Sequence, residues 1–276
     1  MAEFFITLPS QGQRRGGDHL LQVGRAAELT GYTGAYAPFD PEGEESLVIA
    51  AGLLRQSRYL RLLAGFHPGI ATPVYAAKVA ASLQRFSGDR LDWRIDVDLD
   101  PAVARAHGDF TEGADRYARA EEFLTIAKGV WHQREYTHEG RFYQVLSGGF
   151  APPLSGRAFP RVHLSGTSPE ALALSVRHAD VHVFDHGDDL SLTAELPGLT
   201  YGVRLAVHAR ETDEEAARDG FPGLAGSYER IARHIRDYID QGVEVFYLEA
   251  TPYLEETYRL GEHLLPLLAR EIAHAG

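Results

Sequence analysis

Cysteine is absent from this chain of 276 residues, and methionine occurs only once. Without cysteine the protein has no disulfide bonds, no thiolate metal ligands and no cysteine nucleophile. Positive charge is also scarce, because 27 Lys and Arg stand against 39 Asp and Glu and give a formal net charge of -12. Since no run of basic residues occurs, we do not expect nucleic acid or an anionic membrane surface as a partner.

Long apolar runs are missing as well. No segment approaches the ~20 consecutive apolar residues that a membrane-spanning helix needs. The N-terminal segment Met1–Leu8 carries Glu3 where a signal peptide carries basic residues, so we expect a first strand and not a targeting segment. Hydrophobic residues make up 44% of the chain, which permits a sizeable core. These features predict a folded cytoplasmic protein.

Several catalytic motifs cannot be found. No Gly-x-Gly-x-x-Gly follows the first expected strand, which argues against a dinucleotide-binding sheet. No Gly-x-Ser-x-Gly elbow is present, so a serine hydrolase is unsupported. The first strand lacks the two spaced histidines of a metallohydrolase barrel. The acidic alternation of Asp96, Asp98 and Asp100 would lie along a line and not around an ion, so no metal site is predicted.

What the chain does contain is a regular alternation of strand-like and helix-like segments. The expected strands are Glu3–Leu8, Gly34–Pro38, Leu60–Gly65, Leu91–Leu99, Arg161–Ser165, Val181–Phe184, Tyr201–His208 and Val243–Glu249. The expected helices are Asp18–Thr30, Ser46–Gln56, Pro73–Ser87, Arg116–Trp131, Pro169–His178, Tyr228–Gln241 and Leu254–Ala273. This order predicts an α/β fold, a (β/α)8 barrel of TIM type with one domain over residues 1–276, and a doubly wound sheet is the alternative. The irregular stretch Gly140–Pro160 is expected to be an insertion that covers one end of the barrel.

The fourth expected strand alternates apolar and polar residues. Trp93 and Ile95 would face the helices, while Arg94, Asp96 and Asp98 would point into the barrel. Near the carboxyl end of a barrel strand such side chains meet the ligand. An internal ion pair between Arg94 and one of the two aspartates is an equally good interpretation.

The fifth expected strand runs into a turn of small polar residues, Ser165-Gly166-Thr167-Ser168, and a helix begins at Pro169. Free backbone N–H groups at the helix start, two hydroxyls and a glycine that permits close approach are typical of a phosphate site. A plain serine N-cap explains the same residues.

The seventh expected strand places Arg204, Ala206 and His208 on one face. If that face lines the barrel, Arg204 is a buried cation that needs an anionic partner, such as a flavin, a substrate oxyanion, Asp96 or Asp98. His208 would lie higher, at the exit of the strand, either as a solvated rim histidine or as a catalytic one.

Fragments in the same order over nearly the whole chain resemble the bacterial luciferase-like flavin-dependent monooxygenases, and among them the alkanesulfonate monooxygenase branch. They are Ala26–Tyr32, Pro68–Pro73, Ser82–Arg90, Asp115–Tyr117, Gly202–Leu205, Arg210–Thr212 and the closing unit Leu224–Arg259. The resemblance implies a TIM-type barrel and reduced FMN as cofactor, which a separate flavin reductase supplies. The flavin would react with dioxygen and oxygenate a small-molecule substrate.

The resemblance also implies site residues. Gly166, Thr167 and Ser168, with Ser165 before them, match the turn that holds the flavin phosphate. Tyr117 matches an aromatic residue near the flavin, and Arg204 matches the active-site arginine. We therefore predict Arg204 and His208 as catalytic residues. The predicted cofactor contacts are Ser165, Gly166, Thr167, Ser168, Tyr117, Asp98 and Arg94.

The chain departs from the branch at several catalytic positions. Gly43 stands in place of a cysteine, Ala206 in place of a histidine and Thr251 in place of a tyrosine. Asp98 stands where a glycine lets the flavin approach. The region between the seventh and eighth strands is shortened to Arg210–Gly223, which removes an active-site lid and a substrate-binding arginine. With the net charge of -12, this loss argues against a small sulfonate anion and favours an uncharged or bulky substrate.

Three hypotheses follow. The first is an FMNH2-dependent monooxygenase, the second a deazaflavin-dependent hydride-transfer oxidoreductase, and the third a non-catalytic flavin-binding or subunit-like relative. A homodimer, or a heterodimer with a related barrel, is expected from the resemblance.

Overall fold

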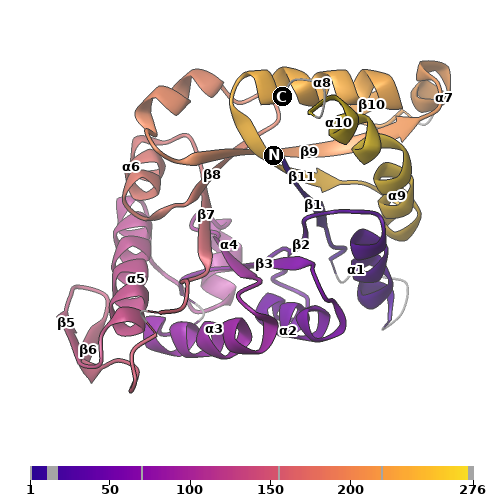
Figure 1. Ribbon diagram of the computed structural model, residues 1–276. Helices are drawn as coiled ribbons and strands as arrows, with labels where there is room; N and C mark the ends of the chain where they lie inside the picture. The colour runs from indigo at the N-terminus through magenta and orange to yellow at the C-terminus, as the bar shows by residue number, and fades with distance from the viewer. Residues whose placement is uncertain (1, 11–17, 70, 155, 219, 273–276) are drawn as a thin grey trace.

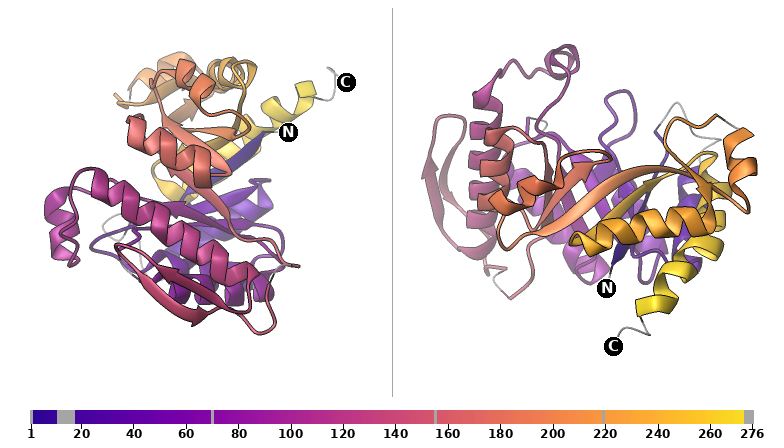
Figure 2. Two further views of the ribbon diagram at one scale, coloured as in Figure 1. Left: turned by 90° about the vertical axis from the view of Figure 1, so that its left-hand side faces the viewer. Right: turned by 90° about the horizontal axis from the view of Figure 1, so that it is seen from above.

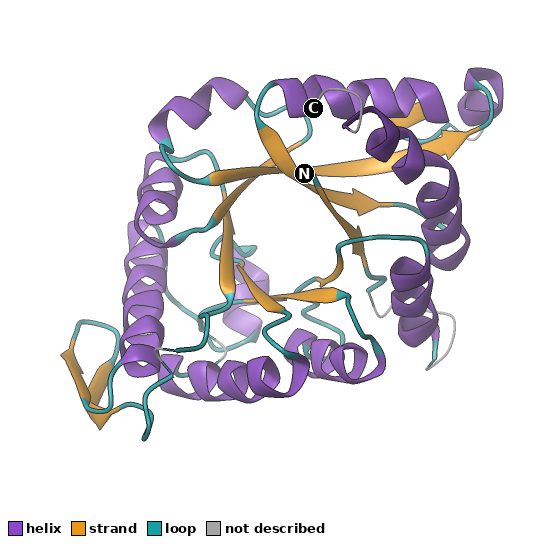
Figure 3. Cartoon of the chain, in the orientation of Figure 1, coloured by secondary structure: helices purple, strands orange, loops and turns teal. Residues whose placement is uncertain are grey.

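Eight parallel strands close into a barrel, and helices surround it on the outside (Figures 1 and 3). The computed structural model of the protein describes residues 2–10, 18–69, 71–154, 156–218 and 220–272. Around the barrel the strand order is β9, β11, β1, β2, β3, β4, β7 and β8, and β8 pairs with β9 to complete the ring. The predicted TIM-type barrel is confirmed, and the doubly wound alternative is wrong.

The barrel strands agree with the predicted ones at most positions. They are β1 (Glu3–Thr7), β2 (Gly34–Ala37), β3 (Arg61–Phe66), β4 (Leu91–Ile95), β7 (Arg161–Ser165), β8 (Val181–Asp185), β9 (Thr200–Arg210) and β11 (Val243–Glu249). The helices around them are α1 (His19–Leu29), α2 (Ser46–Gln56), α3 (Pro73–Ser87), α4 (Pro101–Ala106), α5 (Ala114–His132), α6 (Pro169–His178), η2 (Leu190–Glu195), α7 (Asp213–Arg218), α8 (Tyr228–Asp240), α9 (Tyr253–Arg259), η3 (Leu260–Leu264) and α10 (Leu265–Ile272). The π-helical turn η3 joins α9 to α10, and the predicted end of the last helix at Ala273 lies outside the described residues.

The fourth strand is shorter than expected, because it ends at Ile95 and not at Leu99. Asp100 accepts hydrogen bonds from the backbone N–H groups of Ala102 and Val103 and thereby starts the short helix α4, which the sequence did not predict. With proline in the first turn, this N-cap ends the extended backbone and directs the chain outward.

A short extra strand, β10 (Leu224–Ser227), pairs in parallel with the outer half of β9. The sequence assigned no strand to these residues, and it ended the seventh strand at His208. Both assignments are wrong because β9 runs two residues further and finds a partner there. The shortened region between β9 and β11 therefore holds α7 and β10, which lie beside the barrel and extend the sheet (Figure 1).

The irregular stretch 140–160 does not cover an end of the barrel. Its first part contains β6 (Gln144–Gly148), which forms an antiparallel hairpin with β5 (Tyr136–Glu139) just before the stretch. The hairpin lies outside the ring of helices, next to α5 (Figures 1 and 2). The segment that follows the hairpin is held to α5 by aromatic packing of Phe150 and Phe159 against Trp131. The prediction failed because these partly buried aromatic residues pack against Trp131 of α5 and, for Phe159, against the outward-facing Trp93, and not over the end of the barrel.

Two apolar regions stabilise the barrel. Outside the sheet, Trp93 packs edge-on against Phe66 and Phe159, with ring centroids 5.2 and 5.0 Å apart. Inside the sheet, Phe5, Leu63 and Tyr247 belong to a separate buried cluster. The period of two in β4 thus places Trp93 outward, as predicted, and Arg94 inward.

The amino-terminal end of the lumen is closed by charge pairs. Arg61 Nε donates to Asp92 Oδ2 over 3.0 Å, and Arg161 Nη1 donates to Glu3 over 2.9 Å. His163 lies above them with a short hydrogen bond to the Tyr247 hydroxyl, and burial lowers the pKa of this histidine well below its usual value. In the described part of the chain these side chains fill the amino-terminal end of the lumen, whereas cavities open at the carboxyl ends of the strands.

No described helix is long and apolar enough to cross a bilayer.

Candidate active site

Two neighbouring cavities open at the carboxyl ends of the barrel strands. The first, of about 310 Å³, is lined by Arg94, Asp96, Val97, Asp98, Ser165, Gly166, Thr167, Val183, Asp185, Asp188 and Arg204. The second, of about 440 Å³, is lined by Thr7, Leu8, Ser10, Tyr36, Pro38, Phe39, Asp40, Pro41, Asp96, Asp98, Leu99, Arg204, Glu249 and Tyr253. They share Asp96, Asp98 and Arg204, and we call them together the mouth. Each has the size of a small-molecule site, and TIM barrels carry their active sites at this end.

The mouth gathers most of the residues that the sequence singled out. Arg94, Asp98, Arg204 and three residues of the turn after β7 (Ser165, Gly166 and Thr167) all line it. Tyr117 and Ser168 do not line the mouth but lie next to these residues. Ser168 follows Thr167 in the turn, and its hydroxyl is 3.4 Å from the Tyr117 hydroxyl. The structure thus brings together residues that are more than a hundred positions apart in the chain.

Arg94 is buried in the lumen, where its Nε lies 3.3 Å from Asp96 and its Nη2 donates to Ser165 Oγ over 2.8 Å. Its guanidinium also lies 6.0 Å from the centre of the Tyr36 ring. Of the two aspartates proposed as its partner, Asp96 is the one that pairs. Gly65 on the next strand provides space for this cluster, since an added Cβ there would come within 3.1 Å of Asp96.

The turn after β7 has the backbone geometry of an anion site. Gly166 has φ +112°, and a Cβ at this position would meet the Ala171 side chain at 2.9 Å. Ser168 caps α6, because its hydroxyl accepts a hydrogen bond from the Ala171 N–H over 3.2 Å. The serine N-cap is therefore confirmed, and the phosphate site at this turn stays a prediction that the cap does not exclude.

Asp98 lies beside this turn. The Tyr117 hydroxyl donates a short hydrogen bond to Asp98, and Arg116 Nη2 lies 3.3 Å from the other carboxylate oxygen. Burial and the neighbouring carboxylate raise the pKa of Tyr117 to about 12, so its hydroxyl keeps its proton and remains a donor.

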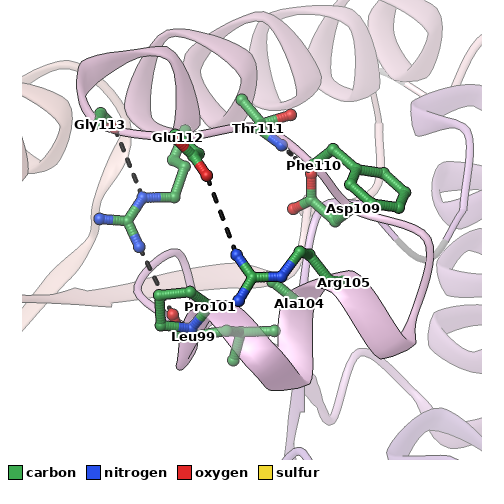
Figure 4. A pocket seen from close by; sticks show the side chains of 10 residues that line it. Leu99, Pro101, Ala104, Arg105, Asp109, Phe110, Thr111, Glu112 and Gly113 are labelled. Carbon is green, nitrogen blue, oxygen red and sulfur yellow. Dashed lines mark hydrogen bonds and ion pairs between the residues drawn. The ribbon is translucent and has the colours of Figure 1, made fainter.

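The segment between β4 and α5 forms one wall near the mouth (Figure 4). It encloses a further cavity of about 410 Å³, which shares Leu99 with the mouth. Arg105 approaches Glu112 to 3.9 Å across it. The wall is held by the buried pair of Arg119 and Asp109, in which Nη1 donates to Oδ1 over 2.8 Å. This arginine pair and a hydrogen bond from Thr111 lower the pKa of Asp109 to about 2 although burial opposes the shift.

Arg204 faces the lumen as predicted, but it is not buried. Its side chain is 47% exposed, and its Nε and Nη2 both lie 2.8 Å from Asp185 Oδ1. The two residues are partners in the register of β8 and β9, and Asp185 is the last residue of its strand. The expectation of a buried cation is wrong because the strand carries Arg204 to the open end of the barrel, and its partner there is Asp185, which was not among the candidates.

His208 does not lie at a solvated rim. Its side chain is 5% exposed and stacks on Phe221 with ring centroids 5.3 Å apart. The extension of β9 beyond the barrel and the pairing with β10 bury this position. The predicted rim location is wrong, and the placement offers no support for a catalytic role.

Sequence reasoning missed Asp185, Asp188 and Glu249, which line the mouth. Asp185 continues the alternation of Val181 and Val183, and Glu249 that of Val245 and Tyr247. The period of two applied to the last residue of each strand would have found these two carboxylates. Among the described residues no group of three or more His, Asp or Glu side chains is arranged to hold a metal ion.

With this geometry in view, comparison with known proteins identifies the family. The profile of the luciferase-like monooxygenases matches residues 3–262. The chain belongs to the luciferase-like monooxygenase family. Enzymes of this family use FMN or the deazaflavin coenzyme F420.

Solved structures agree in fold at low sequence identity. The EDTA monooxygenase of Chelativorans sp. BNC1 superposes with a TM-score of 0.85 at 16% identity, over 98% of this chain and 94% of that one. Monooxygenase RslO1 of Streptomyces bottropensis gives 0.80 at 19% identity, over 97% and 100%. The coenzyme F420-dependent tetrahydromethanopterin reductase of Methanopyrus kandleri gives 0.81 at 11% identity, over 97% and 99%. At these identities the likeness supports the barrel and leaves the choice of cofactor open.

The mouth suits the ring system of a flavin but not the phosphate group of FMN. Its aromatic and apolar lining, with Tyr36, Phe39 and Val183, suits a planar ring system. The turn after β7 fits a phosphate in its backbone geometry, but Asp98 and Asp188 give its surroundings the wrong charge. The charge of these side chains does not fit the phosphate of FMN.

Proposed function

We propose that the chain is a flavin-dependent monooxygenase that oxidises an uncharged or bulky organic substrate in the mouth. The observation that carries the proposal is the convergence of Arg94, Arg204, Tyr36 and the turn after β7 on one continuous pair of cavities at the carboxyl end of the barrel. In a barrel enzyme this is the position of the chemistry.

The chain's own residues would position the reactants and exclude water. Phe5, Leu63, Tyr36 and Tyr247 form a buried apolar cluster below the mouth, which would limit the entry of water from the amino-terminal end. Arg94 holds Asp96 in a fixed pair, and Arg204 at the opening presents a guanidinium to an oxygen on which negative charge develops during the reaction. A bound reduced flavin would supply the activation of dioxygen.

The charge of the mouth supports the choice of substrate. Six carboxylates line it, from Asp40, Asp96, Asp98, Asp185, Asp188 and Glu249, against the two guanidinium groups of Arg94 and Arg204. This balance opposes small anions such as sulfonates, in keeping with the absence of the lid arginine.

Within the family we propose that the chain belongs beside the alkanesulfonate monooxygenase branch, on the motifs quoted above. We further propose a separate flavin reductase as the source of reduced flavin, and a dimer with a second copy or with a related barrel. A cytoplasmic location stays a prediction from composition.

The test combines binding with turnover. The purified chain is titrated with oxidised flavin and with F420, and each titration is followed by visible absorption. It is then incubated with a flavin reductase, NADH, isotopically heavy dioxygen and a panel of uncharged, bulky and sulfonate compounds. We expect flavin binding and incorporation of heavy oxygen into an uncharged or bulky compound.

The other hypotheses give different results. Binding of F420 with no binding of flavin contradicts the proposal in favour of hydride transfer. Flavin binding without turnover of any compound, alone or with a co-purified related barrel, would support a non-catalytic relative.

A further inference from the structure

We propose that Asp98 makes this barrel discriminate against the phosphate group of its flavin, so that it binds riboflavin at least as tightly as FMN. This inference rests on the proposed function, because it assumes that a flavin ring occupies the mouth. It concerns the turn after β7, where the backbone and a neighbouring side chain favour ligands of opposite charge. The backbone of the turn after β7 suits an anion, whereas Asp98 puts a negative charge beside it.

The position of Asp98 relative to the turn is well defined. Its Oδ2 would be 3.9 Å from a Cβ atom at Gly166, and the Tyr117 hydroxyl would be 3.8 Å from the same atom. Gly166 and Asp98 line the same cavity of the mouth. A phosphate held by this turn would therefore lie next to the Asp98 carboxylate.

Asp98 is held in place from two sides. The Tyr117 hydroxyl donates to Oδ2, and Arg116 Nη2 lies 3.3 Å from Oδ1. Arg116 itself is fixed at the start of α5, where its guanidinium contacts the carbonyl oxygens of Gly113 and Leu99 at 3.5 Å. Moving the carboxylate away would break both contacts.

The positive groups near the turn already have partners. Arg94 pairs with Asp96 and donates to Ser165, Arg204 pairs with Asp185, and Arg116 pairs with Asp98. The Ser168 hydroxyl accepts from the Ala171 N–H. Asp188 adds a further carboxylate to the lining. A phosphate ester carries between one and two negative charges near neutral pH, so it would enter a site whose charges are balanced or negative.

The consequence is a difference between two ligands that share one ring system. FMN carries the phosphate and riboflavin does not, so the Asp98 charge acts on the affinity for FMN alone. Removing one charge at a separation of a few ångströms near a protein surface changes an affinity by about tenfold or more.

The experiment measures dissociation constants of the full-length protein for FMN and for riboflavin by quenching of flavin fluorescence at low ionic strength. Wild type is compared with Asp98→Asn and with the control Asp100→Asn. The control removes the same charge two residues away, at the N-cap of α4, where asparagine caps equally well. Circular dichroism verifies that the variants fold.

We expect wild type to bind riboflavin at least as tightly as FMN. Asp98→Asn should tighten FMN binding relative to riboflavin by about tenfold, and added salt should reduce this gain, whereas Asp100→Asn should leave the ratio unchanged. The inference is overturned if wild type binds FMN more tightly than riboflavin, or if Asp98→Asn leaves the ratio of the two constants unchanged. If neither flavin binds to wild type or to Asp98→Asn, the proposed function fails and this inference with it, which separates the two cases.

Discussion

Arg204 is the residue on which the proposed chemistry depends most. It stands at the open end of the barrel, half exposed, with Asp185 as its partner in the sheet register. This geometry keeps the guanidinium oriented and yet accessible from the mouth. Arg94, in contrast, is buried and fully engaged, so it organises the lumen and is not available to a substrate.

Arg204→Ala is expected to lower turnover by about a hundredfold, because an oriented cation facing a developing oxyanion contributes at about that level. Flavin affinity should change little, since the ring and the turn are untouched. The measurement is oxygen incorporation alongside the flavin dissociation constant. Arg177→Ala is the matched control, because Arg177 forms an ion pair of 2.9 Å with Glu121 on the outer helices. Full activity of Arg204→Ala would remove this residue from the mechanism.

Gly166 is expected to tolerate no side chain. Gly166→Ala would combine a left-handed backbone with a contact of 2.9 Å to Ala171, at a cost of roughly 1–3 kcal/mol in the free energy of unfolding. Two control variants, compared by urea denaturation, separate the effect of the left-handed backbone from that of the close contact. Gly31→Ala has φ +89° and open space, so it tests strain alone, and Gly156→Ala has neither strain nor contact. Equal stability of the Gly166 and Gly156 variants would show that the backbone of the turn does not require glycine at position 166.

At the scale of elements, α5 connects the site to the core. Its first turn supplies Arg116 and Tyr117 to the neighbourhood of Asp98. Its middle buries Phe123 between Phe66, Trp93 and Tyr143 at centroid distances of 6.1 to 6.4 Å. The helix thus positions Asp98 through packing that lies far from the mouth.

Phe123→Ala should lower the free energy of unfolding by about 3–5 kcal/mol, because it opens a cavity in the aromatic cluster between α5 and the sheet. Phe86→Ala on α3 is the control, since Phe86 is 85% exposed and its loss should change stability by less than about 0.5 kcal/mol. Urea denaturation followed by tryptophan fluorescence reports both, because Trp93 belongs to the cluster. A small effect of Phe123→Ala would show that α5 is held mainly by other contacts.

At the scale of the whole molecule, several buried histidines are distributed around the fold. His182 lies between β8 and α6 with its Nδ1 2.8 Å from Ser175 Oγ, and burial followed by the charge of Arg94 lowers its pKa to about 4. Burial and Arg119 lower the pKa of His67 to about 4. Its ring lies 3.4 Å from Asp109, but that carboxylate is already paired with Arg119 and so stabilises a charged His67 only weakly. Both histidines are therefore neutral in the folded protein at neutral pH.

This arrangement predicts a loss of stability in mild acid. In the unfolded chain histidine titrates near 6.5, so below that pH the unfolded state takes up protons that the folded state does not. The stability that comes from keeping these histidines neutral is fully present above about pH 6.5. The free energy of unfolding then falls as the pH drops toward 4, by up to roughly 3 kcal/mol for His182. Urea midpoints between pH 7.5 and about 4.5 measure it.

His182→Gln should flatten the dependence of stability on pH, because it removes one titrating group. His132→Gln is the control, since His132 is exposed at the end of α5. An unchanged slope for His182→Gln would show that His182 is not among the groups that titrate.

The sequence by itself determined the class of fold. Strand periodicity, serine and threonine N-caps and glycines after helices are local signals, so seven of the barrel strands and the helices α2, α3 and α6 were predicted to within a few residues of their bounds. It also predicted that the turn after β7 and the polar face of β4 belong to the site, and residues of both line the mouth. Local signals failed where a segment takes its structure from a distant partner, as β10 does from β9, and the hairpin β5–β6 from the aromatic residues under α5.

Only the tertiary structure decided which side chains meet. Closure of the barrel sets the register that pairs Arg204 with Asp185, and the early end of β4 brings Asp98 to Tyr117 and to Gly166. The extension of β9 buries His208 under Phe221 instead of leaving it at the rim. These contacts depend on where each strand ends and on what packs behind it, which are properties of the assembled barrel and not of any one segment.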